Sequence, residues 1–368
     1  MGEALRVVIA GGGTGGHLYP GIAVARELLA RRPDAVISFA GTARGIEARV
    51  VPREGFPLDV LRSGGLKGKS AIDRVRGAAL LPVSLVDAWR IVGRRRPHLV
   101  VGVGGFSSGP VVLAAALRGV ATMLLEQNAV PGLTNRLLAP FVRAAAVTFE
   151  STQTFFGGKA LVSGNPVRPE FLGAVGAEQE SGANEGQHGV GILVFGGSQG
   201  AHAINVAMVA AAAKLAAEGS HLRLTHQTGE RDVEMVRGAY RQAGLQAEVE
   251  PFLYDMGTRI AGADVIVCRS GATTLAELAA AGKAAILVPL PTATDDHQRQ
   301  NALAVASAGA AEVLLQAEMT GPVLAGRILA LAADGAARAR MAKAAKALAR
   351  PDAARVIVDR ALQLVSTT

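Results

Sequence analysis

Residues 7–17 read Val-Val-Ile-Ala-Gly-Gly-Gly-Thr-Gly-Gly-His, an apolar run that passes directly into a glycine-rich turn ending at a histidine. The same order recurs half a chain later, where the apolar run 192–195 is followed by Gly-Gly-Ser-Gln-Gly-Ala at residues 196–201. Each run has the length of a buried strand, and glycines let the backbone turn tightly from a strand into a helix. Two such copies predict two nucleotide-binding folds that face each other across a cleft.

Short apolar runs alternate with helical patterns along the whole chain. Helical patterns include 22–30, 109–117, 335–349 and 352–365. Alternation at this spacing predicts parallel sheets with helices on both faces. The predicted strands are 5–10, 35–40, 58–62, 98–103, 121–126, 144–148 and 160–163, followed by 190–195, 221–227, 246–250, 263–267, 285–289 and 311–315.

The composition of one segment predicts the domain boundary. Residues 173–189 carry almost no large apolar side chains, which is typical of a flexible linker. We therefore expect an N-terminal Rossmann-like domain at 1–163, a linker at 164–189 and a C-terminal Rossmann-like domain at 190–350. The C-terminal helix 351–368 is expected to pack back on the N-terminal domain.

Composition and charge exclude several classes of protein. The chain has 368 residues, enough for two domains with full cores, and its single cysteine, Cys268, excludes an intrachain disulfide and a cysteine-cluster zinc site. No apolar run is long enough to span a membrane, and the N-terminus does not resemble a signal peptide. These features favour the cytoplasm.

The positive charge lies in the first half of the chain. Residues 1–163 hold 20 Lys and Arg against 10 Asp and Glu, whereas residues 164–368 hold 18 against 20. Such asymmetry predicts an acidic partner, either a nucleic acid or an anionic membrane surface. The alternative is a basic surface that serves solubility alone. Few aromatic residues are present to stack on bases, which argues against a nucleic acid.

Three motifs each lack a residue that the corresponding binding site requires. Gly11-x-Gly13-x-x-Gly16 matches the dinucleotide fingerprint, but the second strand ends Phe-Ala-Gly-Thr at 39–42, without the carboxylate that holds the ribose. Gly-Lys-Ser at 68–70 lacks the earlier glycine of a P-loop, because Ser63 stands there. Asp295 and Asp296 form an adjacent acidic pair without a third ligand, so we predict no metal site.

Glycine turns before helices suit a ligand even without those cofactors. The helix that follows presents free N–H groups and a partial positive charge, which suit a diphosphate. The alternative is a tight turn that binds nothing.

Several motifs occur in a fixed order along the chain. They are residues 11–17, 104–110, 126–128, 164–168, 196–201, 268–272, 296–298 and 301–302. With these motifs the chain resembles the peptidoglycan UDP-N-acetylglucosamine transferases almost from end to end. One departure is Leu125, which stands where some relatives carry a histidine.

The resemblance implies a fold and a reaction. It implies the α/β GT-B architecture, with two Rossmann-like domains, and inverting, metal-independent transfer of N-acetylglucosamine from UDP-GlcNAc. The acceptor would be the C4 hydroxyl of the muramoyl sugar of lipid I, and the product lipid II. No cofactor is implied. The implied location is the cytoplasmic face of the bacterial inner membrane, beside anionic lipid and with cell-wall synthesis proteins as further partners.

The chemistry of this transfer assigns roles to residues. His17 is the candidate catalytic base, since the ordinary pKa of histidine lies near working pH, and its alternative role is to orient the turn. The resemblance gives Glu277 the ribose hydroxyls, and Arg168 can add a bidentate charge to the diphosphate. It places the acceptor at Gly104, Gly105, Ser107 and Ser108. The predicted UDP-GlcNAc ligands are Thr14, Gly15, Gly16, Asn128, Arg168, Ser198, Leu253, Ala272, Thr273, Thr274, Leu275, Ala276, Glu277, His297 and Gln298.

A membrane patch is predicted in residues 72–92. Apolar residues recur there at helical spacing, interrupted by Pro82, and arginines surround them. This pattern suits an interfacial site on anionic lipid, and the alternative is an apolar face that packs on the sheet. The residues assigned to the patch are Val75, Ala79, Trp89 and Arg90.

Two other enzymes would share the fold. One is a glycosyltransferase with a different acceptor, for which residues 104–110 and the basic fringe would have no use. The other is a non-hydrolysing sugar epimerase, which would need further acid and base residues near the sugar.

Overall fold

The computed structural model describes residues 3–63, 80–172, 189–197 and 200–366. The chain divides into two compact units. Unit 1 comprises Met1–Val167 and Arg350–Thr368, and unit 2 comprises Arg168–Ala349. Each unit is described by itself.

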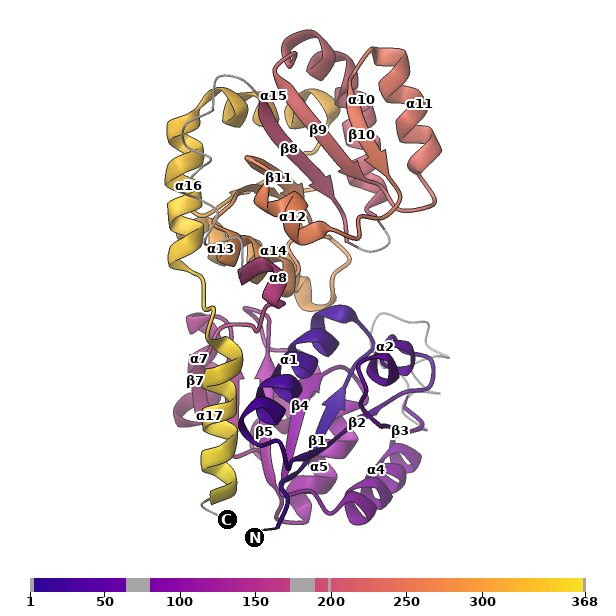
Figure 1. Cartoon of the computed structure of the whole chain (residues 1–368), viewed down its shortest axis with the longest axis vertical. Coiled ribbons are helices and arrows are strands. Elements are labelled where there is room, and N and C mark those ends of the chain that lie inside the picture. Colours follow the sequence, from indigo (N-terminus) through magenta and orange to yellow (C-terminus); the bar gives the residue numbers. More distant parts are fainter. Residues whose placement is uncertain (1–2, 64–79, 173–188, 198–199, 367–368) are drawn as a thin grey trace. The chain divides into compact units, whose positions relative to one another are not determined.

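Unit 1 is built on a parallel sheet of seven strands (Figure 1). The strands, in spatial order, are β3 (Leu58–Val60), β2 (Val36–Gly41), β1 (Arg6–Gly11), β4 (Leu99–Gly104), β5 (Ala121–Glu126), β6 (Ala144–Val147) and β7 (Ala160–Val162). The helices are α1 (Gly15–Arg31), α2 (Glu47–Arg53), α4 (Leu81–Arg95), α5 (Ser108–Leu117), α6 (Leu133–Leu138), α7 (Glu150–Phe156) and α17 (Ala353–Ser366), with the short η1 (Gly157–Lys159).

Two apolar clusters form the core of unit 1. One contains buried side chains of α1 and α17, and the other contains those of α4 and α5. The last helix, α17, lies beside α1 in Figure 1 because its residues Ile357, Val358 and Ala361 form one buried stripe. Arg31 of α1 donates a hydrogen bond to Asp359 of α17, which ties the polar margins of the two helices together.

Unit 2 repeats the design with a parallel sheet of six strands. The strands, in spatial order, are β10 (Ala247–Glu250), β9 (Leu222–Gln227), β8 (Val190–Phe195), β11 (Val265–Cys268), β12 (Ala284–Leu287) and β13 (Glu312–Val313). The helices are α8 (Pro169–Leu172), α10 (His202–Glu218), α11 (Val233–Ala243), α12 (Met256–Ala261), α13 (Ala272–Ala281), α14 (His297–Ser307), α15 (Gly321–Ala333) and α16 (Gly335–Ala347), with the short η3 (Thr294–Asp296).

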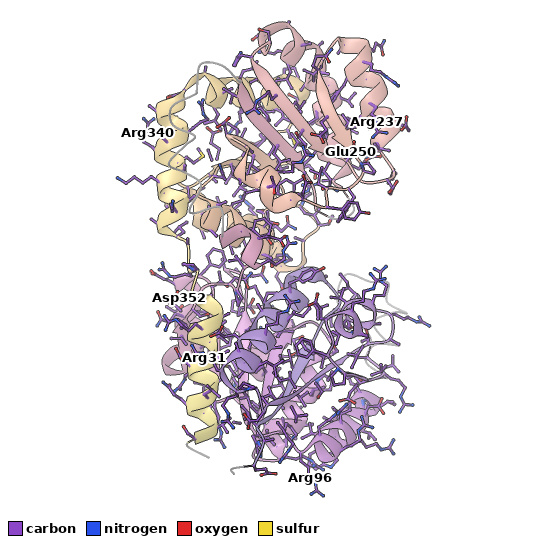
Figure 2. The ribbon with its side chains drawn as sticks, viewed as in Figure 1. Arg31, Arg96, Arg237, Glu250, Arg340 and Asp352 are labelled. Carbon is purple, nitrogen blue, oxygen red and sulfur yellow. The ribbon has the colours of Figure 1, made fainter. Side chains whose placement is uncertain are left out.

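Helix α11 is fixed to the edge strand of unit 2 by an arginine. Arg237 donates from Nε and Nη2 to the carbonyl oxygen of Val249, at 3.0 and 2.7 Å. Its Nη2 also lies 3.4 Å from Oε2 of Glu250, and Figure 2 shows the two side chains together. Arg237 therefore holds the edge of the sheet.

The predicted α/β class and parallel sheets are confirmed. Every predicted strand is present, and the ends differ by at most two residues. The first helix begins at Gly15, earlier than the predicted 22, because the glycine turn runs straight into it. Of the helical pattern predicted over 72–92, the structure describes the part from residue 80, and the described helix begins at Leu81. Pro82 lies in the first turn of α4, where its missing N–H has no partner to lose.

Strand order places one ligand-binding edge in each unit. The order reverses between β1 and β4 in unit 1, and between β8 and β11 in unit 2. Ligands of doubly wound sheets bind outside the carboxyl ends of the strands at such reversals. The glycine turns at 11–17 and 196–201 follow β1 and β8, so both lie at these points. Among the described helices, none is long and apolar enough to cross a membrane.

Candidate active site

The first glycine turn meets the loop after β4 backbone to backbone. Gly11, Gly12 and Gly13 have φ of +141°, +149° and +84°, a range that favours glycine. The Gly12 N–H donates to the carbonyl oxygen of Gly104 at 3.3 Å. A Cβ on Gly105 would lie only 2.6 Å from the carbonyl oxygen of Gly12. Glycine at these positions therefore brings the two predicted segments into one site.

His17 lies at this junction, in the first turn of α1. Thr14 is the N-cap of that helix, and Gly15 and Gly16 are its first two residues. The ring Nδ1 of His17 is 3.2 Å from Oγ1 of Thr14, and a Cβ on Gly104 would lie 2.8 Å from the ring. If Nδ1 carries the proton and donates to Thr14, Nε2 is left as the acceptor that a base requires.

The serines predicted on the acceptor side lie inside unit 1. Ser107 and Ser108 are 3% and 0% exposed at the start of α5. The Ser108 hydroxyl has no hydrogen-bond partner among the described residues, and a Cβ on Gly102 would lie 2.8 Å from it. The exposed side chain of this loop is Phe106.

Glu126 organises the loop that carries Asn128. The carboxylate is 2% exposed and accepts from the backbone N–H of Asn128 and of Gly132, at 3.0 and 2.9 Å. It also accepts from the side-chain amides of Asn135 and Asn128, at 2.9 and 3.3 Å. Burial raises the pKa of Glu126, and these donors oppose that shift. The amide group of Asn128 is thus directed toward Glu126.

The second glycine turn is braced through a carbonyl oxygen. Gly197 and Gly200 have φ of +99° and +73°, and a Cβ on Gly200 would overlap the carbonyl oxygen of Thr228. The buried side chain of Gln227 donates from Nε2 to the carbonyl oxygen of Gly197 at 3.0 Å. Ser198, a predicted diphosphate ligand, lies outside the described residues.

Two predicted ligands of the donor form an ion pair in unit 2. Arg168 donates from Nε and Nη2 to Oε1 of Glu277, at 3.1 and 3.0 Å. Glu277 is 6% exposed on α13, and burial raises its pKa while Arg168 opposes that shift. The arginine also contacts Glu170 at 2.9 Å, and its guanidinium lies 4.6 Å from the ring centre of Phe171. The sequence named both partners but not their contact.

The start of α13 lies at the reversal of strand order in unit 2. The helix begins after Gly271, so its first N–H groups are directed toward the carboxyl edge of the sheet. Thr273 and Thr274 are half-buried in this first turn. The predicted ligands in this segment are Ala272, Thr273, Thr274, Leu275, Ala276 and Glu277.

Hydrogen bonds connect the start of α14 to the segment before α13. Ser270 donates from its hydroxyl to the carbonyl oxygen of Gln298 at 2.8 Å. Oε1 of Gln298 accepts from the backbone N–H of Leu290 at 3.0 Å, so its amide presents Nε2 as a donor. His297 holds Nδ1 2.6 Å from the carbonyl oxygen of Thr294. The side-chain amide of Gln298 and the ring of His297, both predicted sugar ligands, are therefore each held in place by a hydrogen bond.

The acidic pair before α14 stores backbone strain. Asp295 and Asp296 have φ of +55° and +53°, which is uncommon for residues other than glycine. Such strain is found where surrounding structure fixes a loop for function. Asp296 lies 3.7 Å from the guanidinium of Arg299. Within the described ranges, no group of three or more His, Cys, Asp or Glu side chains could hold a metal ion.

Leu253 lies between two exposed aromatic residues. The side chain is 6% exposed in the loop between β10 and α12. Phe252 and Tyr254 on either side are exposed and make an edge contact, with ring centres 4.8 Å apart. Leu253 itself packs into unit 2.

The predicted membrane patch is partly described. Val75 and Ala79 lie outside the described residues, whereas Trp89 and Arg90 are exposed on α4. The ring of Trp89 stacks with the guanidinium of Arg118, 4.3 Å from the ring centre. The apolar residues of α4 form a buried set and an exposed set. One set packs on the sheet and contains Ala88, Ile91 and Val92, while the exposed set contains Leu81, Val86 and Trp89.

A buried carboxylate that the sequence analysis did not single out lies at the first glycine turn. Glu47, at the start of α2, accepts a hydrogen bond from the Gly13 N–H at 2.7 Å. Glu47 lies beyond the end of the second strand, which is where the dinucleotide fingerprint has its carboxylate. The sequence feature that indicates this site is the pair of nearby glycines, Gly41 and Gly45, which leave space for the Glu47 side chain.

Family models match most of the chain. The N-terminal domain of glycosyltransferase family 28 matches residues 7–147, and the C-terminal domain of that family matches residues 191–357. The chain belongs to glycosyltransferase family 28. A relative from Pelobacter propionicus is 46% identical over 375 residues, covering 97% of this chain and 99% of that protein. It is named UDP-N-acetylglucosamine--N-acetylmuramyl-(pentapeptide) pyrophosphoryl-undecaprenol N-acetylglucosamine transferase.

Solved structures agree with this family. The crystal structure of Acinetobacter baumannii MurG is similar with a TM-score of 0.81 and 32% identity, covering 98% of this chain and 99% of that one. UDP-GlcNAc 2-epimerase from Neisseria meningitidis, bound to UDP-GlcNAc, has a TM-score of 0.69 at 13% identity, covering 98% of this chain and 100% of that one. At that identity the likeness shows the fold alone. The predicted family and GT-B fold are confirmed, and the chain is a glycosyltransferase.

Proposed function

We propose that this family 28 enzyme transfers N-acetylglucosamine from UDP-GlcNAc to the C4 hydroxyl of the muramoyl sugar of lipid I, producing lipid II. The transfer proceeds with inversion and without a metal ion. The observation that carries the proposal is the similarity to the Pelobacter propionicus transferase along nearly the whole chain, since its name gives this donor and acceptor.

The nucleotide of the donor is assigned to unit 2. Glu277 accepts hydrogen bonds from the ribose hydroxyls, and Arg168 and the N–H groups that begin α13 meet the diphosphate. As the sugar C1–O bond breaks, its electron pair leaves on the UDP diphosphate, and these cationic and N–H groups stabilise that charge. Gln298 donates from Nε2 to a sugar hydroxyl, which its bond to Leu290 supports.

A difference in how the two glycine turns are braced supports this division. In unit 2 the side chain that holds the turn is Gln227. It donates to the carbonyl oxygen of Gly197 and therefore does not itself occupy an N–H group of the turn. In unit 1 the brace is Glu47, a carboxylate that already occupies the Gly13 N–H. An anion is therefore present at the first turn, and the second is the better place for a diphosphate.

The acceptor half is assigned to unit 1. His17 accepts the proton of the acceptor hydroxyl at Nε2 while Nδ1–H donates to Thr14. The hydroxyl oxygen then forms the new bond to the sugar C1 on the face opposite the departing UDP. The backbone of Gly104 and Gly105 lines the same loop junction.

Transfer of radiolabelled sugar to a water-soluble lipid I analogue tests the reaction. We expect product from UDP-GlcNAc with excess EDTA at a rate within about twofold of that with Mg²⁺, because the donor charge is met by the protein itself. Product with a β linkage is expected from inversion. Tight UDP binding without product would keep the fold and overturn the acceptor. Conversion of UDP-GlcNAc into a UDP-linked epimer, without release of UDP, would favour the epimerase alternative.

Binding to the cytoplasmic face of the membrane is proposed through the exposed apolar and basic residues of α4. The basic residues that follow Trp89 in sequence are Arg90, Arg94 and Arg95 on α4, and Arg96 at the end of the helix. Asp59 accepts bonds from Arg94 and Arg95, which neutralises part of that charge. The remaining basic groups and the exposed Trp89 ring suit an anionic interface.

Sedimentation with vesicles tests this surface. The protein is expected to bind vesicles that contain phosphatidylglycerol at low salt and not vesicles of phosphatidylcholine. Arg90→Ala should weaken binding by about fivefold, the effect of one basic residue near the surface. Arg340, which points away from α16 in unit 2 (Figure 2), supplies the control Arg340→Ala, expected to bind like the parent protein. Equal binding to both vesicle types would contradict the electrostatic part of the proposal.

A further inference from the structure

Glu47 is a buried carboxylate whose bonds converge on the first glycine turn. The residue is 0% exposed. One oxygen, Oε2, accepts from the Gly13 N–H at 2.7 Å, and the other accepts from the backbone N–H and the hydroxyl of Thr42, at 2.9 and 2.8 Å. The Thr42 hydroxyl in turn accepts from the Gly45 N–H at 3.2 Å. The side chain thus joins the ends of β1 and β2 to the start of α2.

The surrounding backbone makes room for this side chain with glycines. A Cβ on Gly12 would lie 2.5 Å from the Glu47 carboxylate, and a Cβ on Gly41 would lie 2.6 Å from its Cγ. A Cβ on Gly45 would overlap the carboxylate oxygens. Gly41 and Gly45 have ordinary φ values, so at these two positions glycine is needed for space alone.

Contacts lead from Glu47 to the candidate base. Glu47 bonds Gly13, the adjacent Gly12 bonds Gly104, and Gly104 has no side chain because the ring of His17 occupies that space. The N-cap Thr14, which bonds the same ring, directly follows Gly13. Loss of the Glu47 hydrogen bonds would free residues 12–14. These residues hold Thr14 and Gly104, the two residues that contact the His17 ring.

We propose that Glu47 is a positioning residue for the transfer reaction: its carboxylate holds the first glycine turn in the conformation that sets Thr14 and His17 against the acceptor. This inference rests on the proposed function. In nucleotide-binding turns the free N–H groups take a phosphate of the ligand. Here the Gly13 N–H takes a carboxylate of the chain itself, so the turn is ordered without a ligand.

The hydrogen bonds of the Glu47 carboxylate with Gly13 and Thr42 form a clamp on the turn. Two substitutions remove this clamp by different routes. Glu47→Gln keeps the shape but places an NH₂ group against a backbone N–H, because an amide accepts at one end only. Gly45→Ala keeps the carboxylate but forces it out of place. Because both act on the same contact, the double variant should lose little more than the worse single variant.

The control removes another buried carboxylate of unit 1. Asp59 is 5% exposed and accepts from Arg94 and Arg95 on α4, with no hydrogen bond to the turn. Asp59→Asn therefore costs stability without touching the clamp. Glu47→Asp provides a partial rescue, since it restores an acceptor at both oxygens on a shorter side chain.

Two readouts are required. In the full-length enzyme, kcat for both clamp variants should fall by roughly 100-fold, the scale of a misplaced catalytic group, while UDP affinity stays within about twofold. The shape of the pH profile should be unchanged, because the titrating group is still His17. Hydrogen exchange, which needs no substrate, should show faster exchange at residues 11–18 and 42 in these variants and not in Asp59→Asn.

Separate outcomes overturn the inference and the proposed function. Faster exchange at the turn with kcat within about threefold of the parent would show that the turn does not position the reaction. Unchanged exchange at Gly13 and Thr42 would show that the clamp does not exist in solution. If the parent enzyme transfers no sugar but the exchange results hold, the proposed function fails and the clamp remains.

Discussion

Replacing His17 with alanine is expected to lower kcat by roughly 100- to 10 000-fold, the range that one general base contributes. The affinity for UDP should stay within about twofold, since the nucleotide of the donor is assigned to unit 2 and His17 belongs to unit 1. The value of kcat falls because the acceptor hydroxyl loses the group that takes its proton. Steady-state transfer to a soluble lipid I analogue gives kcat, and calorimetric titration gives the UDP affinity.

A second substitution separates the base from an orienting role. Thr14→Val removes the oxygen that lies 3.2 Å from Nδ1, and Thr14→Ser retains it. If His17 is the base, Thr14→Val lowers kcat by about tenfold, the weight of one orienting hydrogen bond, and Thr14→Ser does not. A His17→Ala enzyme whose turnover stays within about threefold of the parent, less than 1 kcal/mol, would exclude the base.

The strands and the ligand-binding edges could be predicted from the sequence because their causes are local. A buried strand in a parallel sheet is a short continuous apolar run, as at residues 99–104 and 121–126. Glycines at the ends of such runs mark where the backbone turns sharply, and Gly11 and Gly197 both have positive φ. These features need no knowledge of partners distant in the chain.

Side-chain pairings could not be predicted, because their partners are far apart in sequence. Arg168 and Glu277 are separated by 109 positions, and each was assigned to the ligand without the other. A pairing between near neighbours was missed as well: Asn128 was assigned to the sugar, and its amide also donates to Glu126, two positions earlier. A polar side chain before a ligand-binding turn looks the same in sequence whether it faces the ligand or braces the loop.

The same ambiguity affected α4. Helical spacing gave one apolar set, but a helix on a sheet has one face toward the core, and only the contacts show which residues that face contains. Val92, at the end of the predicted stretch 72–92, is 1% exposed in the core, while Val86 and Trp89 lie at the surface. Packing on the sheet therefore holds for one set of residues of this helix, and the membrane patch stays a prediction for the exposed set.

Glu277→Gln is expected to weaken UDP binding by roughly 10- to 100-fold, because hydrogen bonds to a charged group contribute about 1.5–3 kcal/mol. The donor KM should rise by a similar factor, and kcat should change little. The matched control is Glu170→Gln, which removes the other carboxylate bound to Arg168 but lies outside the predicted ribose contact. If both variants bound UDP like the parent enzyme, the ribose role of Glu277 would be wrong.

The ion pair adds a pH dependence whose sign can be derived. Burial raises the pKa of Glu277, and Arg168 opposes that shift, so Arg168→Gln lets the pKa rise further. A protonated Glu277 accepts fewer hydrogen bonds from ribose, and UDP binding by Arg168→Gln should therefore weaken as pH falls through the raised pKa of Glu277. Stability should change in the opposite direction. A carboxyl group whose pKa is raised by folding favours the folded state at low pH, and that contribution is lost as pH rises through the raised pKa. Opposite slopes for affinity and melting temperature would show that one carboxylate, buried for the fold and charged for the ligand, depends on Arg168 for both.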